Sequence, residues 1–396
     1  MKIRKILKRC TAAMLAAAIG MTTLAANVSA ATSGVSIGYT WNSSVNPTIK
    51  NRKNGVTGGV SGQYIKAGEQ ICRFSPSSTS DWAFCIEPAK SMQGASYKDW
   101  YTQNGFTKYD TFDLSDKNKA DSFAYWKSIG GTDGPMAKYL GLVQYYGYSS
   151  HKTGDYYAAT QCLIWELILG YRGHTQAGFG KCSDILWNDF TYPSGGWCTR
   201  SGVEKAYNDI VSNVKDHYKL PSAMRSTKAQ AKDEPNVMKY NAENLRYETK
   251  VTVPTSYVTA SSLAHNFSSL ESKLGSLIKS KFSGTFGKDY GLETEMSGTN
   301  TVYTIWSKER QFTSSGDSSI YVTESIPMQM KNSLKKQETL FANSYYQTCL
   351  FSTRLDPVVG YVGLASYNEP NLTVEKTYTD SSNNQITAAE LNNLLG

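Results

Sequence analysis

The chain has 396 residues, 40% of them hydrophobic and 19% charged, which is enough sequence for two or three domains with ordinary cores. Five of its 41 basic residues precede residue 10, and the rest of the chain has 36 basic and 33 acidic residues, or a net charge of about +3. The formal charge of +8 is therefore no sign of a basic nucleic-acid-binding surface, and we expect no nucleic-acid partner.

Residues 1–30 are typical of a secretory signal peptide. A basic segment precedes an apolar run at 11–26, and small residues at 28–30 provide a cleavage site near Ala30. The apolar run is shorter than a membrane span needs, and no second run follows it. We therefore expect a mature chain that is secreted or held at the cell surface (cell wall), without a lasting membrane span.

The first part of the mature chain is predicted to combine strands and helices. Two short strands are expected at 71–74 and 82–86, joined by a loop rich in Ser. Apolar residues at helical spacing and capping signals, including a capping box at Ser201, predict helices. The expected helices cover 135–145, 156–170 and 201–217. Together these elements predict an α+β domain at 31–225, with a β-sandwich or barrel-like part and a helical part.

The helix at 156–170 is apolar on nearly every side, so it is predicted to be buried. Gln161 lies on one stripe with Tyr157, Ile164 and Trp165. A buried amide needs hydrogen-bond partners or a chemical role. On the helix pattern alone, a core Gln bonded to neighbouring backbone is the simpler interpretation.

The pattern changes beyond a polar segment at 228–244, where we place a domain boundary. Alternating apolar and polar residues predict a strand at 246–253, and a helix is expected within 263–277. Further strands are predicted at 292–297, 301–307, 320–323, 348–353, 358–365 and 371–379. The region 240–366 is thus predicted to be a mainly β, stalk-like domain, and 367–396 the truncated start of a further β repeat.

The mature chain contains six cysteines: Cys72, Cys85, Cys162, Cys182, Cys198 and Cys349. Cys182 and Cys198 lie in a loop-rich segment and are the favoured disulfide pair. Cys85 and Cys72 could instead pair across the 71–86 hairpin. Because no CxxC pair occurs and the four histidines are scattered, no metal site and no cofactor are predicted.

Two motifs resemble those of the thioester domains of Gram-positive surface proteins. They are Phe84-Cys-Ile-Glu-Pro88 and Ala159-Thr-Gln-Cys-Leu-Ile-Trp-Glu166. In that family an aromatic–Cys–aliphatic motif precedes a Thr-Gln-x-x-Ile-Trp motif on a helix. The likeness covers roughly residues 34–221. The segment 372–376 resembles, more loosely, the opening strand of a collagen-adhesin B-type repeat, which implies that the chain is part of a longer adhesin stalk.

The resemblance implies that Cys85 and Gln161 form an internal thioester with loss of ammonia. An amine on a host or surface protein, in particular a Lys, then attacks the thioester and becomes covalently bonded. The reaction is single-turnover bonding rather than enzyme turnover. Such a bond survives only where water is excluded and the two groups are held together.

Other residues are expected to support this chemistry. Phe84, Tyr157 and Trp165 are the predicted walls of the site. A proton acceptor for the incoming amine is sought among Glu87, His151 and Tyr157, with no basis for choosing one.

Two other functions stay open from the residues. A secreted cysteine hydrolase or acyltransferase would use Cys85 with His151 or His174 as its base. A non-covalent binding module would draw on the 27 tyrosines, with Cys85 and Gln161 purely structural. Only the thioester predicts a mature protein that is lighter by one ammonia.

Overall fold

The computed structural model describes residues 32–50, 52, 63–90, 92, 98–110, 124–130, 135–259, 267–312, 328–331, 338–352, 358–366, 378–379, 381–382 and 384–395. The predicted signal peptide at 1–30 lies outside them. The described residues contain both helices and sheets, in agreement with the predicted α+β class. They divide into two compact units. The first is Met1–Lys219, Ser261–Asn266 and Lys331–Val358, and the second is Leu220–Ala260, Phe267–Met330 and Val359–Gly396.

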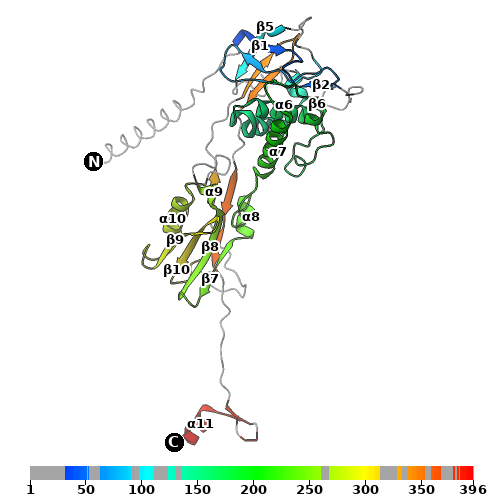
Figure 1. Ribbon diagram of the computed structural model, residues 1–396. Helices are drawn as coiled ribbons and strands as arrows, with labels where there is room; N and C mark the ends of the chain where they lie inside the picture. The colour runs from blue at the N-terminus through cyan, green and yellow to red at the C-terminus, as the bar shows by residue number, and fades with distance from the viewer. Residues whose placement is uncertain are drawn as a thin grey trace, which may run out of the picture. The chain divides into compact units, whose positions relative to one another are not determined.

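The first unit is built on a six-stranded antiparallel sheet (Figure 1). In spatial order the strands are β3 (Phe74–Pro76), β1 (Thr32–Trp41), β5 (Lys98–Asp110), β12 (Glu338–Ala342), β13 (Cys349–Ser352) and β4 (Phe84–Cys85). A separate short pair joins β2 (Thr48–Ile49) to β6 (Phe190–Thr191). The strands β12 and β13 come from far along the chain, so the first unit is discontinuous in sequence.

The two end strands of this sheet, β3 and β4, come together at one point. The N–H of Ala83 donates to the carbonyl of Phe74 at 2.9 Å, and these two residues form an isolated bridge. The sheet is therefore nearly closed into a barrel. Beyond this bridge no further backbone ladder joins the two strands among the described residues, and side chains of a helix occupy the opening.

Helix α6 (Gly154–Ile168) contacts the helices α5 (Pro135–Gln144) and α7 (Arg200–Asp216) and the strand β4. The other helical segments are α4 (Ala124–Ser128), the π-helical η2 (Tyr145–Ser149) and the 3₁₀ segment η3 (Leu186–Asp189). At Gly147 of η2 a Cβ would collide with Thr160 Oγ1. Glycine therefore allows the N–H of Tyr148 to reach that hydroxyl, at 3.1 Å.

The second unit carries a five-stranded sheet. Its order is β15 (Leu364–Ser366), β7 (Asn236–Asn241), β8 (Arg246–Pro254), β10 (Asn300–Ser307) and β9 (Tyr290–Ser297). Its other elements are α8 (Lys228–Asp233), α9 (Thr255–Val258), α10 (Leu270–Lys281), β11 (Met328–Lys331), β14 (Val359–Val362), β16 (Tyr378–Thr379), β17 (Gln385–Ile386) and α11 (Ala388–Leu395). The predicted hairpin of β9 and β10 is present, and Gly298 at its turn has a φ of +59° that favours glycine.

Several predicted boundaries differ from the structure. The strand predicted at 348–353 for the second domain is β13, which pairs in the first unit, because periodicity shows that a strand is buried but not which sheet receives it. The unit boundary falls at Lys219, before the predicted 225. Helix α7 is capped by Thr199, whose hydroxyl accepts the N–H of Gly202, rather than by Ser201. The predicted strand at 320–323 and most of that at 371–379 lie outside the described residues.

Candidate functional site

Helix α6 is buried along almost its whole length, as the sequence predicts. Every residue from Tyr157 to Ile168 is buried, and Thr153 caps the helix by accepting the N–H of Tyr156. Its sequence of Ala, Leu, Ile and aromatic residues contains no Gly or Pro after the first residue, so no break in the hydrogen-bond ladder is expected. This helix carries Gln161 to the opening between β3 and β4.

Strand β4 presents Cys85 with its backbone turned toward that opening. On one side the N–H of Ile86 donates to the carbonyl of Thr348, next to β13, at 3.0 Å. Because backbone groups alternate in direction along a strand, the N–H and C=O of Cys85 point the opposite way, toward β3. No strand of the described residues pairs with them there.

The side-chain amide of Gln161 bonds both of these backbone groups. The N–H of Cys85 donates to Gln161 Oε1 at 2.9 Å, and Gln161 Nε2 donates to the Cys85 carbonyl at 2.8 Å. Both residues have an exposed fraction of 0%. The structure thus brings the two predicted thioester residues into direct contact in a dry environment.

Tyr157, one turn before Gln161, joins the same two strands. Its hydroxyl accepts the N–H of Phe74 at 3.2 Å and lies within hydrogen-bond distance of the carbonyls of Ala83, at 2.6 Å, and Cys72, at 3.0 Å. Its ring stacks on Phe84 with centroids 4.5 Å apart. Two of the three predicted walls therefore pack against one another. The Tyr157 hydroxyl also bonds to backbone groups on both sides of the opening.

The Cys85 thiol has a raised pKa, mainly because burial disfavours the thiolate. The backbone N–H of Glu87 and the indole N–H of Trp165 face the sulfur and partly offset this shift. Trp165 is 1% exposed, and its indole nitrogen has no hydrogen-bond partner of ordinary geometry within the described part of the chain. Trp165 thus forms a third wall and leaves one buried donor free beside the sulfur.

Glu87, a predicted proton acceptor, is near the thiol but engaged elsewhere. Its carboxylate accepts the N–H and the hydroxyl of Thr348, at 3.1 and 2.8 Å, and Lys90 Nζ lies 3.6 Å away. Its charge also contributes to the raised pKa of Cys85. Glu87 therefore anchors the segment after β4 to the residue that precedes β13.

The other acceptor candidate, His151, lies against a different group. Its ring stacks on Tyr156 at 4.0 Å, and Nδ1 is 3.3 Å from the carbonyl of Gly147. The Tyr156 hydroxyl in turn donates to Asp209 of α7. Within the described residues no interaction joins His151 to Cys85.

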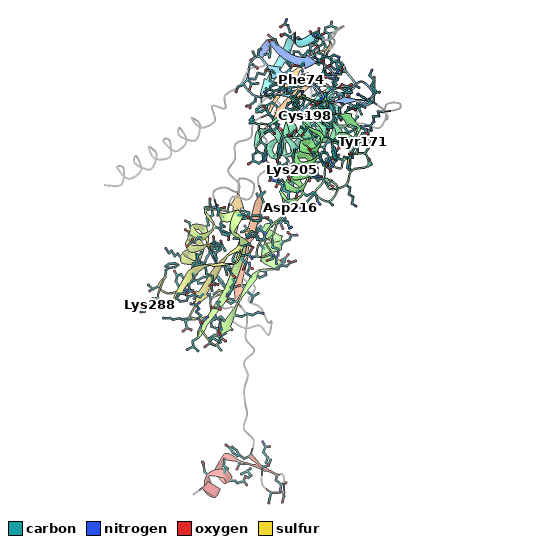
Figure 2. All side chains as sticks on the ribbon, viewed as in Figure 1. Phe74, Tyr171, Cys198, Lys205, Asp216 and Lys288 are labelled. Carbon is teal, nitrogen blue, oxygen red and sulfur yellow. The ribbon has the colours of Figure 1, made fainter. Side chains whose placement is uncertain are left out.

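The predicted disulfide between Cys182 and Cys198 is absent, and all six cysteines are free thiols. Cys182 donates to the carbonyl of Asp184 at 3.1 Å, whereas Cys198 is buried just before the N-cap of α7. Figure 2 labels Cys198 within the first unit. The alternative pair, Cys72 with Cys85, is not formed either.

Sequence reasoning missed two buried residues near Cys85. Cys349 of β13 stands in register with Cys85 of β4. Glu69 has its pKa raised to about 7 by burial, and its charge contributes to the raised pKa of the Cys85 thiol. Neither lies in a motif, and strand pairing across so long a separation has no local signal in the sequence.

The described residues contain no group of three or more His, Cys, Asp or Glu side chains arranged to hold a metal ion. None of their helices combines the length and apolar character needed to cross a membrane. An open groove of about 620 Å³ runs over β7 and β8, lined by residues such as Lys239, Tyr240 and Glu248, and holds none of the predicted site residues.

Comparison with known proteins adds no relative. No protein-family model, no curated protein and no solved structure matches the chain.

Proposed function

We propose that the chain is an exported surface adhesin that forms an internal thioester between Cys85 and Gln161 and then bonds covalently to an amine. One observation carries the proposal: both polar atoms of the Gln161 carboxamide bind the backbone of Cys85 itself, at 2.9 and 2.8 Å. A core glutamine needs any two partners. For this one, both partners are backbone groups of Cys85, the residue whose thiol would attack it.

The orientation suits nucleophilic attack. The amide is bonded in the plane of the β4 backbone, whereas side chains of a strand stand roughly perpendicular to the sheet. A Cys85 thiol that stands out of this plane would meet the face of the amide, which is the direction from which a carbonyl carbon is attacked. Holding both groups in this geometry replaces a costly encounter by an intramolecular step.

Thioester formation requires only atoms that are present. The sulfur bonds to Gln161 Cδ, the oxyanion on Oε1 is stabilised by the N–H of Cys85, and the thiol proton moves to Nε2. The C–N bond then breaks and ammonia leaves. No net proton is consumed, so the raised pKa of the thiol is compatible with the step.

Amine bonding reverses the roles of these groups. An amine nitrogen attacks Cδ, the C–S bond breaks, and the sulfur leaves as a thiolate that takes a proton from the amine. The N–H groups of Glu87 and Trp165, which face the sulfur, stabilise the departing thiolate. The product is an amide at Gln161 and a free Cys85 thiol.

Burial explains how a thioester would persist. Cys85, Gln161 and Tyr157 are all inaccessible to solvent, so water does not reach the bond in this state. An amine reaches Cδ only after the covering residues move. The partner expected from the family resemblance is a Lys side chain on a host or surface protein, and each chain bonds once.

The mass of the purified mature protein tests the proposal. We expect it to be lower by one ammonia than the sequence requires, and the difference should disappear in Cys85→Ala. Methylamine should add its own mass to the wild type and release one thiol per molecule. An unmodified mass in freshly purified protein would refute the thioester and leave a structural role for Gln161.

A further inference from the structure

Cys349 lies directly opposite Cys85 on the neighbouring strand. The register pairs Cys349 with Cys85 and Leu350 with Phe84. Because the N–H of Ile86 bonds to the carbonyl of Thr348, the adjacent pair of cysteines occupies a non-hydrogen-bonded position. At such positions the Cα atoms are about 4.5 Å apart and the side chains share one face of the sheet. This separation lies within the range that disulfides span.

Both sulfurs are available for bonding to each other. Cys85 and Cys349 are free, and each has an exposed fraction of 0%. Among the described residues, the Cys349 thiol makes one weak hydrogen bond, of 3.9 Å, to the carbonyl of Gln347. The pKa of the Cys349 thiol is raised mainly by burial, and the charge of a Cys85 thiolate raises it further, as expected for two neighbouring sulfurs.

The third nearby thiol, Cys72, is separated from Cys85 by side chains of α6. Extending the register of the bridge between Phe74 and Ala83 would place Cys72 opposite Cys85. Instead, the Tyr157 hydroxyl binds the Cys72 carbonyl, and the Gln161 amide takes the backbone groups of Cys85 on that side. Cys349, with no side chain inserted between the strands, is the partner that the register favours.

We propose that Cys85 and Cys349 form a cross-strand disulfide, a second covalent state of the site. An oxidised low-molecular-weight thiol, such as glutathione disulfide, is the oxidant. Its S–S bond breaks, one S–S bond forms in the protein, and the two protein thiol protons pass to the two released thiols. Because both cysteines are buried, the exchange takes place while the chain folds or while β4 is transiently open.

The disulfide and the thioester use the same sulfur, so they exclude each other. A Cys85 sulfur bonded to Cys349 cannot attack Gln161, and a sulfur bonded to Gln161 cannot be oxidised. This competition rests on the proposed function, whereas the disulfide itself does not. Reduction would return the chain to the state from which the thioester forms.

The test uses the mature chain with Gln161→Glu, which removes the thioester and leaves all cysteines in place. The protein is refolded in a mixture of reduced and oxidised glutathione, denatured, treated with an alkylating reagent and digested without reduction. We expect a peptide pair linked through Cys85 and Cys349, and an intact mass lower by two hydrogens before alkylation. Cys182→Ser, which changes a thiol outside the site, should keep the link, and Cys349→Ser should lose it.

Wild-type protein provides the second arm and does not depend on the folding of the variant. After refolding in the oxidising mixture, its ammonia-deficient fraction should fall, and Cys349→Ser should restore it. The inference would be overturned if, after refolding in the oxidising mixture, Cys85 and Cys349 were both alkylated. It would also be overturned if Cys85 were linked to Cys72. A wild type that shows the Cys85–Cys349 link but never loses ammonia would refute the thioester alone.

Discussion

Gln161 serves Cys85 as a substitute for a neighbouring strand. Its side-chain oxygen and nitrogen bond the N–H and the C=O of Cys85, the two groups that face the opening between β3 and β4. A helix side chain thereby completes the hydrogen bonding of a sheet edge. The same contact holds the carboxamide against Cys85, as the proposed thioester requires.

Gln161→Glu should abolish thioester formation, because a carboxylate is a poor acyl donor and has no ammonia to release. One carboxylate oxygen can still accept the N–H of Cys85, but the other would face the Cys85 carbonyl and repel it. We expect a loss of about 1–3 kcal/mol in the free energy of unfolding at neutral pH. Intact mass and adduct formation with methylamine measure the chemistry.

The pH dependence of this variant follows from the same clash. Protonation of the introduced carboxyl restores a donor toward the Cys85 carbonyl, so its pKa is higher in the folded than in the unfolded state. The folded state then holds the proton more tightly, and stability falls as pH rises through the folded-state pKa.

Gln144→Glu is a matched control for the chemistry. Gln144 is also buried and accepts the N–H of Ser352 at 2.6 Å, so this variant should still form the thioester between Cys85 and Gln161, with loss of ammonia. Adducts of Gln161→Glu at the wild-type rate would show that Gln161 is not the acyl group.

Tyr157→Phe should loosen the junction of β3 and β4. The hydroxyl serves Phe74, Cys72 and Ala83, and its removal leaves buried backbone groups without their partner. We expect a loss of about 1–3 kcal/mol by denaturant unfolding. Tyr156→Phe, which removes a hydroxyl bonded to the partly exposed Asp209, should cost less. Equal costs for the two variants would contradict the structural role given to Tyr157.

Trp165→Phe should slow amine bonding while largely preserving packing. The indole N–H faces the Cys85 sulfur and is otherwise unpartnered among the described residues, so its loss removes a donor that stabilises the leaving thiolate. We expect the rate of methylamine addition to fall about tenfold, which corresponds to about 1.4 kcal/mol in the barrier. Trp187→Phe is the control, since Trp187 stacks against Arg200 instead. An unchanged rate in Trp165→Phe would exclude this role.

Glu69→Gln should change how stability depends on pH. Burial raises the pKa of Glu69 to about 7, above its ordinary value of 4.5. The folded state therefore binds this proton more tightly, and the resulting stability is full below about pH 4.5 and lost as pH rises through about 7. Raising the pH from 5 to 8 should therefore lower the free energy of unfolding of the wild type by up to ~3 kcal/mol, and Glu69→Gln should not show this loss. Unfolding at both pH values measures this, with the largely exposed Glu234→Gln as a control that should show little change.

The sequence by itself predicted the elements that depend on neighbouring residues. Helix α6 follows from its apolar pattern and is buried as expected, and the hairpin of β9 and β10 follows from alternation around Gly298. The motifs also singled out Cys85 and Gln161 as a pair, and the structure brings the two into contact. These features are local, or belong to short motifs whose order along the chain can be read directly.

Only the tertiary structure decided which distant segments meet. The chain leaves the first unit, forms most of the second and returns to place β13 beside β4, which sets Cys349 against Cys85. The favoured disulfide of Cys182 and Cys198 was wrong because proximity in a loop-rich segment does not fix how two side chains point. Periodicity reports which face of an element is buried, but strand pairing between remote segments depends on the packing of the whole core, and no local pattern encodes it.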